Sequence, residues 1–296
     1  MGIRFKFNLI ILLIFAGGFA ASAYLVKQVL IENAKQEVAL NAGIMMAAAK
    51  SARSYTVDEV RPLLHELNSE EFLPQTVPAY SATESMKRMR KTFPDYTYKE
   101  AALNPTNPEH KAADWEEDII HYFQTYEDVK EYTGVRDTPT GQYLFLSRPF
   151  KITNQACLAC HSDPNIAPPN LIKRYGSTNG FGWKHNEIIG AQIVNVPMSI
   201  PLARADEAFT TFMIILGAIF IVIWLILNLL LYLVIIKRID AIALTAEKIS
   251  KGDMSSPELK TDGKDEIDSL GHSFNLIYRS LCSAVKLLDK TQAGMR

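Results

Sequence analysis

An uncharged stretch of 28 residues, Phe209 to Ile236, restricts what this chain can fold into more than any other feature. As an α-helix rising about 1.5 Å per residue, it exceeds the roughly 30 Å hydrocarbon core of a bilayer. Its one strongly polar residue, Asn228, is either a link between the helices of a dimer or a tolerated polar residue. Lys237 and Arg238 follow directly, and such positive charge marks the cytoplasmic side. We therefore expect a transmembrane helix over residues 209–236 whose C-terminal end faces the cytoplasm.

The N-terminus carries a second uncharged apolar stretch, residues 8–26. Arg4 and Lys6 precede it, and the small residues Ala21-Ser22-Ala23 near its end are also typical of a cleavable signal peptide. Its length is about the 20 residues that a span needs, which favours an uncleaved anchor. With either alternative, residues 27–208 lie outside the cytoplasmic membrane. With an uncleaved anchor, both termini of this two-span protein are cytoplasmic.

The sequence Cys157-Leu158-Ala159-Cys160-His161 is the strongest chemical signal in the extracytoplasmic part. Two thiols three positions apart can add to the two vinyl groups of one haem, and the adjacent imidazole then ligates the iron. Because the chain has only three Cys and six His in 296 residues, a chance match is on the order of 10⁻³. The motif predicts one covalent haem c, attached through Cys157 and Cys160, with His161 as the proximal iron ligand.

Three other interpretations of the two cysteines compete with haem: a thioredoxin-like redox pair, half of a zinc site, and a structural disulfide. A redox pair usually opens a helix after a strand, whereas a Pro-rich segment, residues 163–169, follows this one. Zinc needs four ligands, and the only other cysteine, Cys282, lies far away in the sequence. Haem is therefore the favoured interpretation.

The extracytoplasmic part is long enough for one domain with its own core. Helical spacing of apolar residues and the position of breaking residues predict helices over 31–55, 82–91 and 112–123. Strand patterns follow at 129–135, 142–150 and 188–196, with a hairpin turn at 137–141 between the first two. Helices followed by an antiparallel sheet predict an α+β domain with its helices on one side. The haem motif then lies in the loop between the second and third of these strands.

The order of several motifs resembles the family of single-haem, PAS-like extracytoplasmic sensor domains that precede signalling modules in bacteria. The segments that carry the resemblance cover about residues 40–198 and are Arg53-Ser54-Tyr55-Thr56, Thr76-Val77-Pro78-Ala79, residues 98–107, Arg148-Pro149, the Cys/His motif, Gly180-Phe181-Gly182-Trp183 and Gly190-Ala191. The resemblance implies a PAS-like fold, one haem c, and a redox-sensing or gas-sensing role in the periplasm. It does not identify the signal.

The sixth position of the iron decides between electron transfer and ligand binding. Met45 and Met46 lie on the helix expected beside the haem, although Met at helical spacing more often fills a core. His185 is a further candidate because Trp183 adjoins it, while His65, His110 and His121 are the other extracytoplasmic histidines. Arg148 and Arg53 are candidates for pairing with haem propionates, which a guanidinium suits, or for surface ion pairs. The distal ligand stays open.

Heptad spacing begins after the second span. One seam runs through Ile239, Ile242, Ala246 and Ile249, and a second runs through Ile267, Leu270, Phe274, Ile277, Leu281, Ala284 and Leu288. A connector with Gly252, Pro257 and Gly263 separates them. Two amphipathic helices so joined predict a parallel helical bundle, and a four-helix core requires a homodimer. With Asp265-Glu266-Ile267, the segment 237–290 resembles a HAMP domain, although the first helix lacks the usual early Pro; a plain juxtamembrane coiled coil is the alternative.

The favoured hypothesis is a haem-c sensor in the bacterial inner membrane. A change at the iron alters the helix that continues the first span, and displacement of the spans biases two packings of the HAMP bundle. The chain offers no room for a kinase or cyclase after Leu288, so the expected output is a separate cytoplasmic protein. The alternative is a membrane-bound monohaem cytochrome that passes electrons to an extracytoplasmic redox partner. A haem enzyme has less support, because no acid–base constellation is evident. With 31 basic and 32 acidic residues, no nucleic-acid partner is implied.

Overall fold

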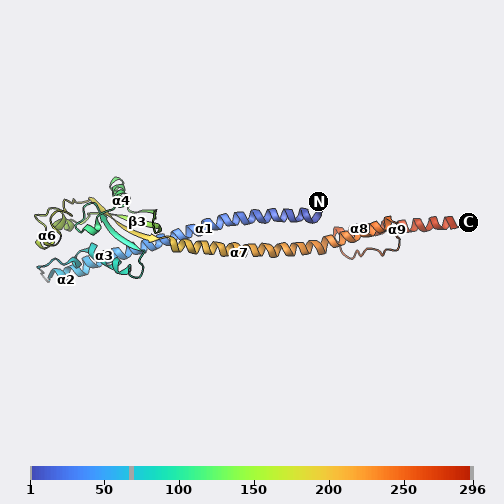
Figure 1. The fold of residues 1–296 in the computed structure, drawn as a ribbon, viewed down its shortest axis with the longest axis horizontal. Coiled ribbons are helices and arrows are strands. Elements are labelled where there is room, and N and C mark those ends of the chain that lie inside the picture. The colour runs from blue at the N-terminus through green and yellow to red at the C-terminus, as the bar shows by residue number, and fades with distance from the viewer. Residues whose placement is uncertain (1, 67–69, 294–296) are drawn as a thin grey trace. The chain divides into compact units, whose positions relative to one another are not determined.

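The structure, a computed structural model, describes residues 2–66 and 70–293. It divides into two compact units (Figure 1). One unit is Tyr24–Thr210, and the other consists of Met1–Ala23 with Thr211–Arg296. Two helical runs, Ile3–Glu66 and Ser199–Ser250, are long and apolar enough to cross a membrane. They contain both of the predicted spans.

Helix α1 (Ile3–Tyr55) is a single helix of 53 residues. It contains the expected first span and the expected helix 31–55 without an interruption, because neither Pro nor a strong breaker occurs in it. A π-helical turn, Thr56–Val60, follows, and a short α2 (Arg61–Glu66) begins where Pro62 can be accommodated in the first helical turn.

A four-stranded antiparallel sheet forms the centre of the unit Tyr24–Thr210. Its strands are β1 (Thr97–Ala102), β2 (Tyr132–Thr138), β3 (Gly141–Lys151) and β4 (Ile188–Pro197), in the order β1-β4-β3-β2. The three predicted strands are confirmed, with β2 starting three residues later than expected. The turn between β2 and β3 is tight, because Thr138 already pairs with Gly141. The sequence prediction missed β1, which pairs with β4 at the edge of the sheet.

Helices cover both faces of this sheet. On one face, α1 and α3 (Pro78–Met89) pack on the strands, and the buried cluster there includes Val38, Met46, Met86, Leu146 and Val194. On the other face lies α4 (Asp114–Thr125), with a second cluster of Ile120, Phe123, Phe145, Ala191 and Ile193. The expectation that all helices lie on one side was wrong. The central strands β3 and β4 carry apolar side chains at successive positions, so both of their faces need cover.

The remaining elements of this unit are short. They are the 3₁₀ turns Pro74–Thr76, Pro108–His110 and Gln155–Cys157, and the helices α5 (Leu158–His161) and α6 (Pro169–Tyr175). Helix α7 (Ser199–Leu230) begins one residue after β4 ends, so the central strand leads directly into the second apolar helix.

In the other unit, the two apolar helices are joined by a polar contact. The side-chain amides of Asn8 and Asn228 bond each other reciprocally, at 2.9 and 3.0 Å, and the Trp224 indole N–H donates to Asn8 Oδ1 at 2.7 Å. The rings of Phe15 and Phe220 stack 4.6 Å apart. Asn228, which was expected either to link a dimer or to be tolerated, thus bonds within its own chain.

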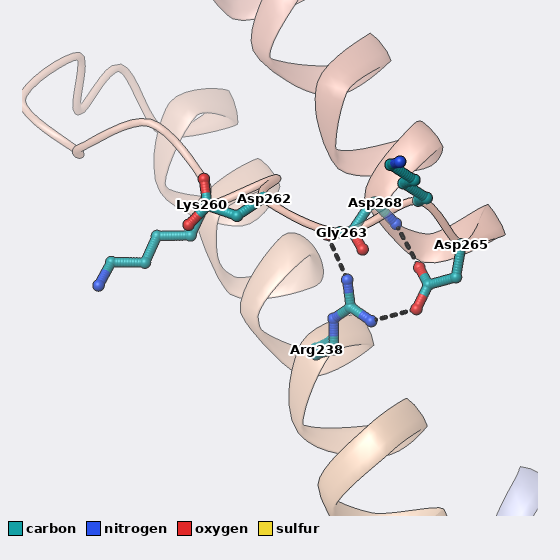
Figure 2. A pocket seen from close by; sticks show the side chains of 7 residues that line it. Arg238, Lys260, Asp262, Gly263, Asp265 and Asp268 are labelled. Carbon is teal, nitrogen blue, oxygen red and sulfur yellow. Dashed lines mark hydrogen bonds and ion pairs between the residues drawn. The ribbon is translucent and has the colours of Figure 1, made fainter.

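A π-helical segment, Leu231–Ile236, leads from α7 into α8 (Lys237–Ser250), and a connector joins α8 to α9 (Glu266–Ala293). Buried Asn275 of α9 bonds both the backbone N–H and the carbonyl of Leu259 in the connector, at 3.0 and 2.8 Å. Arg238 pairs with Asp265 at 2.6 Å and also with Asp268, beside an open hollow (Figure 2). Two helices with a pinned connector agree with the predicted helix pair.

Candidate haem site

The Cys/His motif lies in the long loop between β3 and β4, where the sequence placed it. Cys157 precedes the first residue of α5, and His161 is its last residue. Asn154 fixes the entry to this turn, because its side-chain oxygen accepts the Ala156 N–H at 2.9 Å. Cys157 and Cys160 are three positions apart, which is about one helical turn. Both thiols therefore lie on the same side of this short helical segment, and His161 follows directly in the sequence.

The imidazole of His161 is held by three neighbours. Its Nδ1 lies 2.8 Å from the Gly180 carbonyl oxygen and 3.4 Å from Thr106 Oγ1. The Trp183 indole stacks on it, with ring centroids 3.9 Å apart and planes 14° from parallel. A carbonyl can only accept, so Nδ1 donates and carries the proton of the neutral ring. This tautomer leaves Nε2 with a free lone pair, as an iron ligand requires.

Burial lowers the pKa of His161, while the hydrogen bond to Gly180 opposes the shift. The neutral form, which can ligate a metal, is therefore favoured near neutral pH.

Backbone contacts between the motif and residues 180–183 set this geometry. The Gly182 N–H donates to Ser162 O at 2.9 Å, and the Trp183 N–H donates to His161 O at 3.2 Å. Gly180 has φ +84°, and a Cβ there would lie 2.8 Å from the Cα of Thr106. Only glycine fits this left-handed position beside the neighbouring backbone.

The segment that contains Thr106 is tied to the same loop. The Asn104 side chain accepts the Gly180 N–H at 3.2 Å and donates to Phe181 O at 3.4 Å. The Gly180 carbonyl, which orients His161, is thus held both by the segment that follows β1 and by contacts within its own loop.

Both cysteines of the motif are free thiols of intermediate exposure. Burial raises the pKa of the Cys160 thiol, and the charge of Arg61 opposes this shift. Arg61 also donates from Nε to the Thr76 carbonyl oxygen at 3.1 Å. Across residues 2–66 and 70–293, no three His, Cys, Asp or Glu side chains are grouped as a metal site.

The side chains present fit a covalently attached haem. Two unpaired thiols at the required sequence spacing directly precede a histidine whose Nδ1 is bonded to a carbonyl and whose Nε2 is left for a ligand. A carbonyl bonded to the other nitrogen and a stacked ring fix the imidazole's orientation, as is usual for a metal-ligating histidine. This donor set matches one haem attached through Cys157 and Cys160 and ligated by His161.

The two arginines expected to meet propionates both have carboxylate partners. Arg53 pairs with Glu100, which is only 4% exposed, and lies over the Phe150 ring at 4.9 Å. Arg148 pairs with Glu131 at 2.8 Å near the surface. Their role toward a haem stays a prediction, and Arg61, which the sequence did not single out, is the cation whose charge acts on Cys160.

The structure does not bring the candidate distal ligands together with His161. Met45 and Met46 are 5% and 1% exposed in the core cluster between α1 and the sheet. His185 is exposed in the turn that precedes β4. Their coordination of iron stays a prediction for the haem-loaded protein.

The remaining histidines of the unit Tyr24–Thr210 have surroundings that differ from those of His161. His65 and His121 are exposed, and His121 bonds Gln124. His110 is half-buried beside β1, and its Nδ1 is buried without a hydrogen-bond partner among the described residues. Burial lowers the pKa of His110, while the charge of Glu100 opposes the shift.

Sequence reasoning missed the roles of four residues around His161. Asn104, Thr106, Gly180 and Trp183 all occur in segments that carried the family resemblance, but nothing in the sequence indicated that they meet at the imidazole. The one available signal was the run Gly180-Phe181-Gly182-Trp183, because glycines around a large aromatic residue often mark a close backbone approach.

Comparison with known proteins gives two family matches. The Tll0287-like family (Tll0287) matches residues 31–197, and the HAMP domain family matches residues 230–282. Among solved structures, the crystal structure of the cyanobacterial haem protein Tll0287 is similar, with 18% identity over 51% of this chain and 94% of that one and a TM-score of 0.38. None of the curated proteins matches the chain. The sequence resemblance to a haem sensor domain followed by HAMP is confirmed, and the chain belongs to the Tll0287-like family.

Proposed function

We propose that this chain is a dimeric, membrane-anchored haem-c sensor that passes a change at the iron through its HAMP domain to a separate cytoplasmic protein. A HAMP domain implies signal transduction, and membership of the Tll0287-like family suggests haem binding. The covalent attachment, the nature of the stimulus and the dimer are the parts that this proposal adds. It assigns no catalytic step to the chain.

The observation that carries the proposal is the arrangement of His161 within the Cys/His motif. Its Nδ1 donates to the Gly180 carbonyl, which fixes the ring, and burial favours the neutral form, in which Nε2 is available. A haem bound through Cys157 and Cys160 supplies an iron whose oxidation state and sixth ligand can change. The residues of this chain hold and orient that group, and Trp183 limits rotation of the imidazole plane.

The route of the signal begins at the ends of the haem loop. The Ile152 N–H donates to Glu187 O at 2.9 Å, and the Asn186 N–H donates to Ile152 O at 2.8 Å, so the loop is closed next to β4. Strand β4 ends at Pro197, Met198 is 2% exposed, and α7 starts at Ser199. The helical run then continues to Ser250 in the HAMP segment. A change of a few kcal/mol in the free-energy difference between the two packings of the bundle is enough to shift their populations.

The proposed location is the bacterial inner membrane. Positive charge at Lys237 and Arg238 favours a cytoplasmic HAMP domain, and the haem unit is then periplasmic. Covalent haem c is made on that side, which supports the orientation.

Cysteine crosslinking in membranes tests the proposal. Ile277→Cys is placed in a Cys282→Ser background, and crosslinking between copies by a bismaleimide, which needs no oxidant, is measured with the haem oxidised and reduced. We expect its rate to depend on the haem state, and we expect His161→Ala to abolish that dependence. The matched control is His185→Ala, an exposed histidine of the neighbouring turn. A state-dependent rate that survives His161→Ala would contradict the proposed mechanism.

Optical spectra separate this function from simple electron transfer. Purified protein is reduced and exposed to CO, and the Soret band is recorded. A shift on CO addition supports sensing through the sixth position. Rapid electron exchange with an extracytoplasmic donor, together with no effect on HAMP crosslinking, would favour the cytochrome alternative instead.

A further inference from the structure

Helix α1 carries an apolar stripe that the rest of its own unit leaves uncovered. Leu25, Val29, Leu40 and Ile44 are 62%, 57%, 65% and 58% exposed. They are separated by 4, 11 and 4 positions, and because 11 residues make about three helical turns, all four lie on one face. The opposite face carries the buried residues Ala34, Val38, Ala42, Met45, Met46 and Ala49. The helix therefore has two apolar faces, and only one of them is used within the chain.

The middle of this stripe is uncharged, and two glutamates, Glu32 and Glu37, lie at its edges. The other positions on the same face, 33, 36, 47 and 51, are Asn, Gln, Ala and Ser. Leu40 lies about 20 Å along the helix beyond residue 26, where the expected span ends. Two exposed large apolar residues, Leu40 and Ile44, one helical turn apart in water, indicate a contact surface. Arg204 of α7 pairs with Glu37 at 3.8 Å at the side of α1 and leaves the stripe open.

Gly43 supplies an independent observation. It lies in the interior of α1 next to Ile44, where glycine costs about 1 kcal/mol relative to alanine. A Cβ at this position would meet nothing within 4 Å inside the chain, and the backbone is ordinary helix. Packing within the chain therefore gives no reason for glycine. Close approach by a second helix does, because small residues let two helix backbones come together.

We infer that this face of α1, from Leu25 to Ser51, is the parallel contact surface for a second copy of the same chain. The HAMP segment also has apolar side chains that its own chain leaves uncovered. Leu270, Ile277 and Leu281 of α9 are 53%, 67% and 40% exposed. A second copy of the chain, held parallel by the same membrane, is the occupant that both segments can share. Leu40, Gly43 and Ile44 are uncharged, so they can pack against the same residues of that copy. The inference rests on the anchored orientation in the proposed function and not on the haem.

The 11-residue spacing also fixes the geometry of the contact. A strict seven-residue repeat twists two helices into a left-handed supercoil, whereas an 11-residue repeat gives nearly straight helices with a slight right-handed twist. The two α1 helices are therefore expected to run side by side from the membrane surface outward. A movement of one haem unit against the other then reaches the spans through this contact.

Single cysteines in the full-length protein test the inference in native membranes. Leu40→Cys and Ile44→Cys are compared with Lys35→Cys, which is exposed but lies roughly 140° around the helix from Leu40. All three carry Cys282→Ser, and also Cys157→Ala with Cys160→Ala, which removes the haem and the other thiols together. Mild oxidation should give homodimers several-fold faster for Leu40→Cys and Ile44→Cys than for Lys35→Cys. Equal rates at the three positions, or a crosslinked product containing a different protein, would overturn the inference.

A second pair of variants probes the close approach at Gly43. Gly43→Leu should reduce crosslinking through Leu40→Cys several-fold, because the larger side chain separates the helices. Gly43→Ala, which favours the helix itself, is the matched control and should retain most of the crosslinking. Unchanged crosslinking in Gly43→Leu would contradict close approach at this position. Since every variant in this experiment lacks haem, a failure of haem sensing would leave these outcomes unchanged.

Discussion

Replacement of Gly180 by alanine should weaken the hold on His161 more than replacement of Gly182. Both glycines have left-handed backbone angles, with φ +84° and +82°. A methyl group at Gly180 meets the Thr106 backbone, with the added Cβ 2.8 Å from its Cα, whereas one at Gly182 meets nothing within 4 Å. The two substitutions therefore share the conformational cost and differ in the steric one.

The magnitudes follow from these two contributions. A left-handed conformation costs a non-glycine residue about 1–2 kcal/mol. Forcing an extra methyl group into a filled site costs roughly a further 1–3 kcal/mol. Gly182→Ala should then lower the unfolding free energy of the unit Tyr24–Thr210 by about 1–2 kcal/mol, and Gly180→Ala by roughly 2–5 kcal/mol. The displaced loop also moves the Gly180 carbonyl away from His161 Nδ1, now 2.8 Å distant.

The assay combines urea unfolding of the purified full-length protein with its reduced optical spectrum. We expect a lower unfolding midpoint for Gly180→Ala than for Gly182→Ala, and a changed haem spectrum in Gly180→Ala alone. Adding Thr106→Ala should restore only part of the loss, because the clash with the Thr106 backbone persists. Equal stability and identical spectra for the two glycine variants would refute the assigned role of Gly180.

Three further predictions concern other parts of the chain. Burial lowers the pKa of His110 below its usual 6.5, so the unfolded state binds the proton first and unfolding midpoints should fall as pH drops below about 6.5; His110→Leu should flatten this dependence in urea titrations, and the exposed control His185→Ala should not. Asn228→Leu should weaken the pairing of the two apolar helices by about 0.6 kcal/mol, measured as slower crosslinking between cysteines in the two spans, and Asn8→Leu should have a larger effect because it also removes the bond from Trp224. Asn275→Leu removes two hydrogen bonds to the HAMP connector and should destabilise the helix pair by about 1–3 kcal/mol, so the connector should be cleaved faster by a protease.

The parts of the fold that the sequence predicted are those with local or covalent causes. Two uncharged apolar stretches determine helices regardless of their neighbours. The prediction of haem c rests on the spacing within the Cys/His motif alone and stays a prediction. Strand β1 was missed because Thr97-Tyr98-Lys99-Glu100-Ala101-Ala102 lacks an apolar alternation. Its burial comes from pairing with β4 and from cover by helices far away in the sequence, which no local pattern records.

The surroundings of the site could not be predicted for the same reason. Arg53 finds Glu100 47 positions away, and His161 finds Gly180 19 positions away. The sequence shows that an arginine is present, but its nearest carboxylate depends on which strand lies beside α1. A buried carboxylate such as Glu100 needs a cation more than an exposed propionate does, since an unpaired buried charge is costly.

In the proposed function, two routes lead from the loop with the Cys/His motif to the two apolar helices, and they differ in stiffness. The route to α1 passes through noncovalent contacts, with Arg53 over Phe150 and paired with Glu100. The route to α7 is the polypeptide itself, because β4 is bonded along its length to β1 and β3 and becomes α7 after one residue. A strand hydrogen-bonded on both sides moves only with the sheet, so displacement at the loop is transmitted to α7 rather than absorbed. In this proposal α7 moves relative to α1. The hydrogen bonds between Asn8 of α1 and Asn228 of α7 would have to stretch or break to allow that movement.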